Sequence, residues 1–239
     1  IVRVIARADP SVALVASMHP AVLSFWGALG EAPAPYTAAF AEQRRFVAQT
    51  AIEGHFWGTI TSEPGSGGDV AKSRAPAARV GTGYALSGQK HFGSGSGIAS
   101  YMITSALPEG ESDADWFYLD LRNVPWDGSQ GVKLISEWDG QGMTATQSHA
   151  FAFDGFAATR MAWPGNLTVV SGAAGAFVST LFSAVIMGIV ETAIAQAHEA
   201  LRKRKDGLRP YEQIEWVRAQ NEAWLIEQAF EGMRRAVEA

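Results

Sequence analysis

The sequence predicts an α+β fold with a central antiparallel β-sheet or small barrel between two sets of helices. Residues 1–54 carry apolar side chains at helical spacing, whereas residues 55–165 change to short apolar or alternating runs separated by Gly, Ser, Asp and Pro. From 166 to 239 the helical spacing returns. We therefore expect a partial N-terminal helical domain, a β-domain and a partial C-terminal helical bundle.

The first block predicts two long helices. They cover ADPSVALVASMHPAVLSFWGALG and YTAAFAEQRRFVAQTAIEG, and the proline-containing stretch EAPAP separates them. The chain starts at Ile1 inside a helical pattern and without Met, so we expect a processed or partial chain.

The middle block predicts strands. Apolar or alternating runs separated by turn-forming residues are typical of an antiparallel sheet. The runs are FWGTIT, YALSGQKHF, YMITSAL, WFYLDL and HAFAFDGF.

The last block predicts a long apolar helix followed by a second helix. No charged residue occurs from Met161 to Val190, and the run is apolar enough to imitate a membrane span. Serines, threonines and glycines dilute it and Glu191 ends it, so we interpret it as a helix buried on nearly all sides of a bundle. Gly207 and Pro210 separate it from the second helix.

Composition excludes several classes of function. The chain has 24 acidic and 19 basic residues, with one short basic cluster at 202–205, so we expect no nucleic-acid partner. It has no cysteine, which removes disulfides and thiolate chemistry and favours a cytoplasmic location. The five histidines are dispersed, and we expect no metal site and no membrane association.

Two glycine-rich stretches, TSEPGSGGD and GQKHFGSGSG, carry the candidate site. Neither has the spacing of a P-loop or a dinucleotide-binding turn. Thr61 and Ser62 offer hydroxyls and backbone amides to the polar edge of a planar conjugated ligand, and in the second stretch Phe92 offers a ring and Ser94 a donor. Glycines beside them allow close approach of a ligand to the backbone: Gly65, Gly67, Gly68, Gly93 and Gly95. We expect the two stretches on neighbouring strands.

These stretches also carry a family resemblance. TSEPGSGGDV resembles the TEPxxGSD signature of the acyl-CoA dehydrogenase superfamily, and GYALSGQKHFGSGSG resembles that family's second flavin segment, GQKxWITNG. Further on, EWDGQGMTATQSHAFAFDGF is similar to the family's LGMRGTxTxxVxFDxV stretch. The order and spacing agree, and the resemblance covers nearly the whole chain.

The resemblance implies a flavoprotein of fatty acid metabolism that oxidises an acyl-CoA thioester to its trans-2-enoyl form. It implies FAD as cofactor, an electron-transfer partner, and a homotetramer or homodimer. By position, Thr61 and Ser62 would contact the flavin, as would Phe92, Gly93 and Ser94 of the second segment.

The sequence departs from the family pattern at the substrate side. Gly68 takes the position of the signature's Ser, which contacts the substrate, and AFVSTLFSAV lacks the Asp-x-x-Arg motif that grips CoA. Ser179 stands where one subgroup has a catalytic Glu, so no catalytic residue is assigned and the base is expected outside this chain. Asp206 replaces the Phe of a segment that reaches the ADP half of the cofactor, which weakens the implication of FAD; FAD stays the first choice and FMN is the alternative.

Two other functions stay open. Monooxygenases of the same fold take reduced flavin, supplied by a flavin reductase, and oxygen, and they hydroxylate aromatic or sulfur compounds. They share an F-x-S-G-like second segment and often lack Asp-x-x-Arg, but they usually lack the EPGxG signature. In such an enzyme His91 or His149 would matter as a proton donor; otherwise we expect both to be exposed. A non-catalytic family member is the third possibility.

Overall fold

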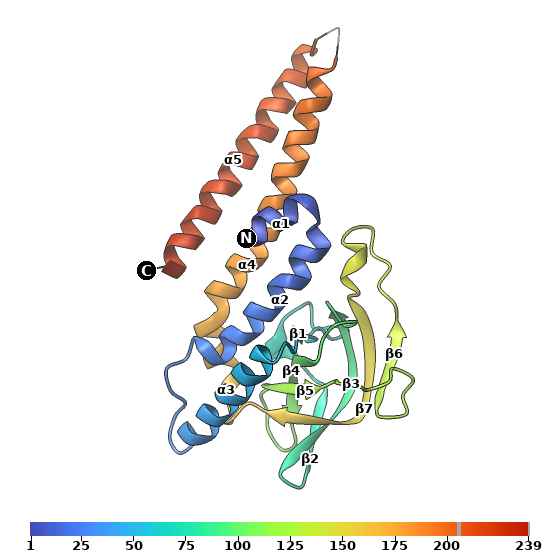
Figure 1. Ribbon diagram of the computed structural model, residues 1–239, viewed down its shortest axis with the longest axis vertical. Helices are drawn as coiled ribbons and strands as arrows, with labels where there is room; N and C mark the ends of the chain where they lie inside the picture. Colours follow the sequence, from blue (N-terminus) through green and yellow to red (C-terminus); the bar gives the residue numbers. More distant parts are fainter. Residues whose placement is uncertain (205–206, 239) are drawn as a thin grey trace. The chain divides into compact units, whose positions relative to one another are not determined.

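The computed structural model describes residues 1–204 and 207–238. Lys205 and Asp206, and with them the predicted replacement of a cofactor-contacting Phe by Asp206, lie outside the described residues. Helices open the chain, as predicted: α1 (Val2–Ala8), α2 (Pro10–Gly27) and α3 (Thr37–Ile52) (Figure 1). Asp9 caps α2, because its carboxylate accepts the N–H groups of Ser11 and Val12 at 2.8 and 3.0 Å.

Seven strands form the middle of the chain. Each of the five predicted runs overlaps one of them, whereas β2 and β6 were not predicted. The strand β2 exposes every residue except Ala77, so it lacks the alternating pattern by which strands are found. The strands are β1 (Trp57–Thr59), β2 (Pro76–Val80), β3 (Gly83–Gly93), β4 (Tyr101–Pro108), β5 (Asp115–Asp120), β6 (Val132–Ser136) and β7 (His149–Arg160).

The sheet closes into a barrel. Its pairs run β4-β2-β3-β7-β5, and β5 pairs with β4 again, while β1 lies beside β4 and β6 beside β7 (Figure 1). Most strand pairs are antiparallel, as predicted, whereas the β1–β4 and β2–β4 pairs are parallel. Long connections that contain other strands separate the members of both pairs, and parallel pairing requires such crossovers.

Apolar side chains fill the barrel. The core cluster includes Ile60, Leu86, Phe117, Phe151 and Phe153, all nearly inaccessible to solvent.

Trp57, at the start of β1, joins this barrel to α2 and α3. Its ring stacks on Tyr101 with centroids 4.5 Å apart, and its indole N–H donates to Thr50 of α3 at 3.0 Å. The backbone N–H of Trp57 donates to His19 Nδ1 of α2 at 3.0 Å.

The chain forms two compact units, which we describe separately. One comprises Met18–Gly175 and holds the barrel; the other comprises Ile1–Ser17 together with the chain from Ala176 onward. Two long helices end the chain, as predicted: α4 (Asn166–Arg202) and α5 (Pro210–Glu238). In the second unit Arg3 of α1 bonds Glu191 of α4 and, at 2.8 Å, Glu227 of α5.

The expectation that the apolar helix is buried on nearly all sides is wrong for the described chain. In the second unit Ala184, Met187 and Phe230 form a small core, but Ile186 of α4 is 52% exposed and Trp224 of α5 is 58% exposed. In the second unit α4 packs against α1 and α5, but part of its apolar surface stays exposed. By length and composition alone α4 could cross a membrane, a property that core helices share.

Candidate functional site

The two glycine-rich stretches lie side by side in the barrel unit. Ser62 and His91 form an antiparallel bridge in which the His91 N–H donates to the Ser62 carbonyl at 2.8 Å. This contact brings Thr61 and Ser62 beside Phe92 and the residues after it.

The hydroxyls of Thr61 and Ser62 are available to a ligand. Both side chains are partly exposed. Among the described residues neither hydroxyl has a hydrogen-bond partner in the protein. A pair of unused donors and acceptors at the end of a strand suits the polar edge of a planar ring.

An aromatic wall stands on the other stretch. Phe92 is 57% exposed and has a φ of 59°, a left-handed conformation that is uncommon for a bulky residue and concentrates at functional sites. Its ring meets Trp138 edge to face, with centroids 6.0 Å apart. The indole N–H of Trp138 donates to the Met143 carbonyl at 3.0 Å, and its backbone N–H donates to His149 Nδ1 at 2.9 Å. The two rings are therefore held in place beside the bridge.

Internal packing explains why position 93 is a glycine. A Cβ atom there would lie 2.9 Å from Ser96 Oγ and 3.0 Å from Ile60 Cδ1. The position excludes a side chain because the protein itself fills the space, so clearance for a ligand is not its only reason.

Ser94 ends a chain of hydroxyl groups with a fixed direction. Thr146 donates its single proton to the Met143 carbonyl at 2.9 Å, so Ser148 must donate to Thr146 across 2.7 Å. Ser94 must then donate to Ser148 across 2.8 Å. We predicted Ser94 as a donor to the ligand edge, but this order leaves only its acceptor lone pairs for a ligand.

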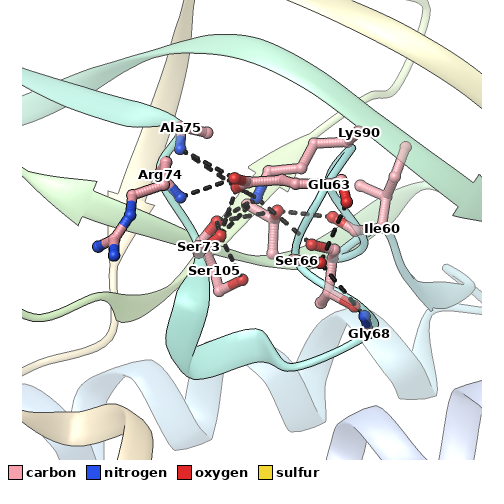
Figure 2. Close-up of polar contacts among 11 residues, drawn as sticks. Ile60, Glu63, Ser66, Gly68, Ser73, Arg74, Ala75, Lys90 and Ser105 are labelled. Atoms are coloured by element: carbon pink, nitrogen blue, oxygen red, sulfur yellow. Dashed lines mark hydrogen bonds and ion pairs between the residues drawn. The ribbon is translucent and has the colours of Figure 1, made fainter.

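Behind the bridge a buried ion pair joins the two stretches. Lys90 Nζ donates to the Glu63 carboxylate, to Ser73 Oγ at 3.0 Å and to the Ser105 carbonyl (Figure 2). The Lys90 side chain is 0% exposed and that of Glu63 is 8% exposed.

Both members of this pair have displaced pKa values. Burial lowers the pKa of Lys90, and the neighbouring carboxylate only partly offsets it. Burial alone would raise the pKa of Glu63, but hydrogen bonds from Lys90, Ser73 and the Arg74 N–H outweigh it and leave that pKa below its ordinary value. Glu63 is therefore ionised and fully engaged at neutral pH.

Glu63 also closes the glycine-rich loop. Its carboxylate accepts the N–H groups of Arg74 at 2.6 Å and of Ala75 at 3.2 Å, so the loop leaves and returns at one side chain. Gly68 is exposed, with a φ of 82°, and Gly65 and Gly67 also have positive φ. The tight loop thus requires glycine for its backbone conformation. A substrate contact at Gly68 stays a prediction.

The protein resembles known proteins in its structure and not detectably in its sequence. No protein-family model matches the sequence, and no curated protein is significantly similar to it. The solved structures of similar fold include butyryl-CoA dehydrogenase from Megasphaera elsdenii, with a TM-score of 0.71 and 19% identity over 99% of this chain and 60% of that one. They also include KijD3 in complex with FMN and a dTDP-sugar, with a TM-score of 0.72 and 18% identity over 98% of this chain and 57% of that one.

The fold is that of the acyl-CoA dehydrogenases. The element order of helices, barrel and long helices matches it, so the predicted fold class is confirmed. The methanesulfinate monooxygenase MsuC from Pseudomonas fluorescens shares the fold with a TM-score of 0.68 and 21% identity, over 98% of this chain and 60% of that one. The chain spans about three fifths of the length of these proteins.

A cavity of about 490 Å³ lies in the barrel unit, next to both stretches. Ile60, which precedes Thr61, and Ser96, which follows Gly95, are in its wall, together with Trp126, Phe151 and Phe153. Its size is that of a small-molecule site, and its wall mixes these apolar side chains with polar ones such as Arg122 and Asn123.

Sequence reasoning missed several residues of this site. Trp138 was not among the predicted site residues, although its position in the third family-like motif could have drawn attention to it. Ser148 and Lys90 were not singled out either. Unless the protein is a monooxygenase, His91 and His149 were expected to be exposed, but both are half-buried.

Proposed function

We propose that the protein is a flavin-dependent oxidoreductase whose flavin ring lies across Thr61–Ser62 and Phe92–Ser94. The observation that carries the proposal is the Ser62–His91 bridge, which brings the unpaired hydroxyls of one stretch beside the exposed ring of the other. The arrangement fits a flavin, because that ring system needs hydrogen bonds at its polar edge and an apolar wall on its face. We propose FAD as the cofactor, with FMN as the alternative.

The reaction that we propose first is the α,β-dehydrogenation of an acyl-CoA thioester. Bound flavin would accept the hydride that leaves the β-carbon while a carboxylate removes the α-proton. The TSEPG signature supports this reaction, as does the fold shared with butyryl-CoA dehydrogenase. Thr61 and Ser62 would orient the ring, and Phe92 with Trp138 would exclude water from one side of it.

The structure leaves the base of this reaction unassigned. Glu63 follows the proposed flavin contacts directly, but its carboxylate is buried and accepts from Lys90, Ser73 and two backbone N–H groups. An ionised carboxylate with this many donors is a poor proton acceptor, so Glu63 does not take the role of base.

A second candidate is a monooxygenase that uses reduced flavin and oxygen on an aromatic or sulfur compound. The specific observation in its favour is the absence of any charged residue from Met161 to Val190, which removes the Asp-x-x-Arg motif. The HFGSG stretch also suits this class, and the methanesulfinate monooxygenase MsuC shares the fold. The carboxylate base of a dehydrogenase is not needed here.

The partners follow from the reaction. A dehydrogenase of this kind needs an electron-transfer partner, whereas a monooxygenase needs a flavin reductase. We propose a homotetramer or homodimer acting in the cytoplasm, in fatty acid metabolism if the first reaction holds.

Substrate-dependent reduction of the flavin separates the two reactions. We expect that anaerobic addition of a suitable acyl-CoA, from a series of short, long, branched and steroid-like thioesters, bleaches the oxidised flavin band. Dehydrogenation is refuted if no thioester does so while reduced flavin and oxygen convert an aromatic or sulfur compound. The protein without thioester and the free flavin with thioester are the controls.

A further inference from the structure

We propose that Glu63 and Lys90 are positioning residues for the flavin, because their ion pair sets the spacing of the two stretches that contact the ring. The inference rests on the proposed flavin site and deepens it. Neither side chain reaches the ring in this account; both act through the residues next to them.

Glu63 lies one residue from a proposed contact on the first stretch, and Lys90 lies two residues from Phe92 on the second. Glu63 follows Ser62, and Lys90 precedes His91, whose N–H bonds the Ser62 carbonyl. The two stretches are therefore joined twice, by a backbone hydrogen bond and by the ion pair behind it. One connection would leave the stretches free to pivot, whereas two connections fix their relative orientation.

The same charges tie this junction to the rest of the barrel. Lys90 donates to the Ser105 carbonyl of β4, and Ser105 Oγ donates to Ser73 Oγ at 3.0 Å (Figure 2). Glu63 accepts the N–H groups of Arg74 and Ala75, where the glycine-rich loop returns to β2. The junction therefore cannot shift without breaking several hydrogen bonds at once.

The chemistry of the pair favours positioning over plain stability. Two well-packed apolar residues of similar volume often stabilise a fold as well as a buried ion pair does. The hydrogen bonds of the pair also fix the orientation of the two side chains, because a hydrogen bond weakens steeply when its donor and acceptor are misaligned. The pair also balances its own charge, so it places no net charge behind the ring.

A matched pair of substitutions tests the proposal. Glu63→Gln keeps the shape and removes the charge, and Asp115→Asn does the same at a second buried ion pair of this unit, where Asp115 is 1% exposed and bonds Arg160. Flavin-free protein would be titrated with FAD and with FMN, with flavin fluorescence as the readout. We expect Glu63→Gln to weaken flavin binding about tenfold, and Asp115→Asn to change it less than about twofold.

A milder pair covers the case in which the charge substitutions do not fold. Ser73→Ala removes one hydroxyl that bonds both charges, and Glu111→Gln removes one of the partners of Arg160. We expect only Ser73→Ala to weaken flavin binding and to shift the visible spectrum of the bound flavin. A role in stability alone would move neither readout when the variants are compared well below their unfolding temperatures.

The midpoint potential of the bound flavin gives a second readout. Glu63→Gln leaves the Lys90 cation unbalanced and should raise the potential, whereas Lys90→Met leaves the carboxylate and should lower it. Equal flavin affinities for Glu63→Gln and Asp115→Asn, with unchanged potentials, would overturn the proposal. If the unsubstituted protein binds no flavin, the proposed function fails instead, so the two failures are distinguishable.

Discussion

Replacing Lys90 by Met should strongly destabilise the barrel unit. Lys90 is 0% exposed, and the substitution leaves the Glu63 carboxylate, itself 8% exposed, buried without its cation. Breaking a buried pair by removing one partner costs about 3–5 kcal/mol, because the remaining charge is uncompensated. With about 2–4 °C per kcal/mol for a chain of this size, the unfolding temperature should fall by roughly 6–20 °C.

Replacing both partners should cost much less. Lys90→Met combined with Glu63→Leu leaves no buried charge, and such exchanges are often neutral or stabilising. The Ser73 hydroxyl and the Arg74 and Ala75 N–H groups lose a partner, so we expect the double variant between the single variant and the unsubstituted protein.

Urea denaturation, monitored by tryptophan fluorescence, measures these differences in unfolding free energy. Trp57 and Trp116 report on the barrel unit. Arg122→Met is the control, because it removes one partner of an exposed pair whose side chains are 42% and 48% exposed. Exposed pairs contribute about 0–1 kcal/mol. A loss below about 1 kcal/mol for Lys90→Met, similar to that control, would refute the argument for an uncompensated buried charge.

Further predictions concern the flavin contacts and pH. Ser62→Ala should weaken flavin binding by about 1 kcal/mol, roughly fivefold, measured by flavin titration; equal affinity would remove Ser62 from the site. Gly93→Ala should destabilise the barrel unit by about 1–3 kcal/mol in urea denaturation, because its Cβ would meet Ser96 and Ile60 at 2.9 and 3.0 Å, and an unchanged midpoint would contradict the packing. The pKa of Glu63 lies below its ordinary value of 4.5, so its stabilisation is complete above that pH and is lost as the pH falls through the lowered value. Glu63→Gln should therefore flatten the acid limb of a plot of unfolding free energy against pH, whereas a limb of unchanged steepness would show that Glu63 does not titrate in this way.

The sequence predicted most of the fold. Strands such as β3 and β4 were found because they alternate or are continuously apolar between turn residues, and helices such as α3 were found from their spacing. The strand β6 escaped because it is short and its residues are mostly exposed. Parallel pairing of β1 with β4 could not be predicted, since it depends on contacts far apart in the chain.

The candidate site was only partly predictable. Thr61, Ser62 and Phe92 belong to local motifs, and the structure does bring these motifs together. The ion pair joins residues that are 27 positions apart, and neither motif alone indicates that Glu63 and Lys90 meet. The direction of the hydroxyl chain at Ser94 depends on Thr146 and Ser148, which only the fold places there.

The exposure of α4 could not be predicted from the sequence either. Its apolar composition predicted burial, but composition does not say which neighbours are present. In the described chain α4 packs against α1 and α5, and Phe182 and Ile186 stay 43% and 52% exposed.

Flavin binding by the purified protein tests the central claim most directly. The protein would be stripped of cofactor and titrated with FAD and FMN, while the absorption band of the flavin and its fluorescence are followed. The account predicts saturable binding with a changed flavin spectrum, and loss of that change in a variant that combines Ser62→Ala with Phe92→Ala. Absence of binding by the folded protein, or full binding by the double variant, would contradict it.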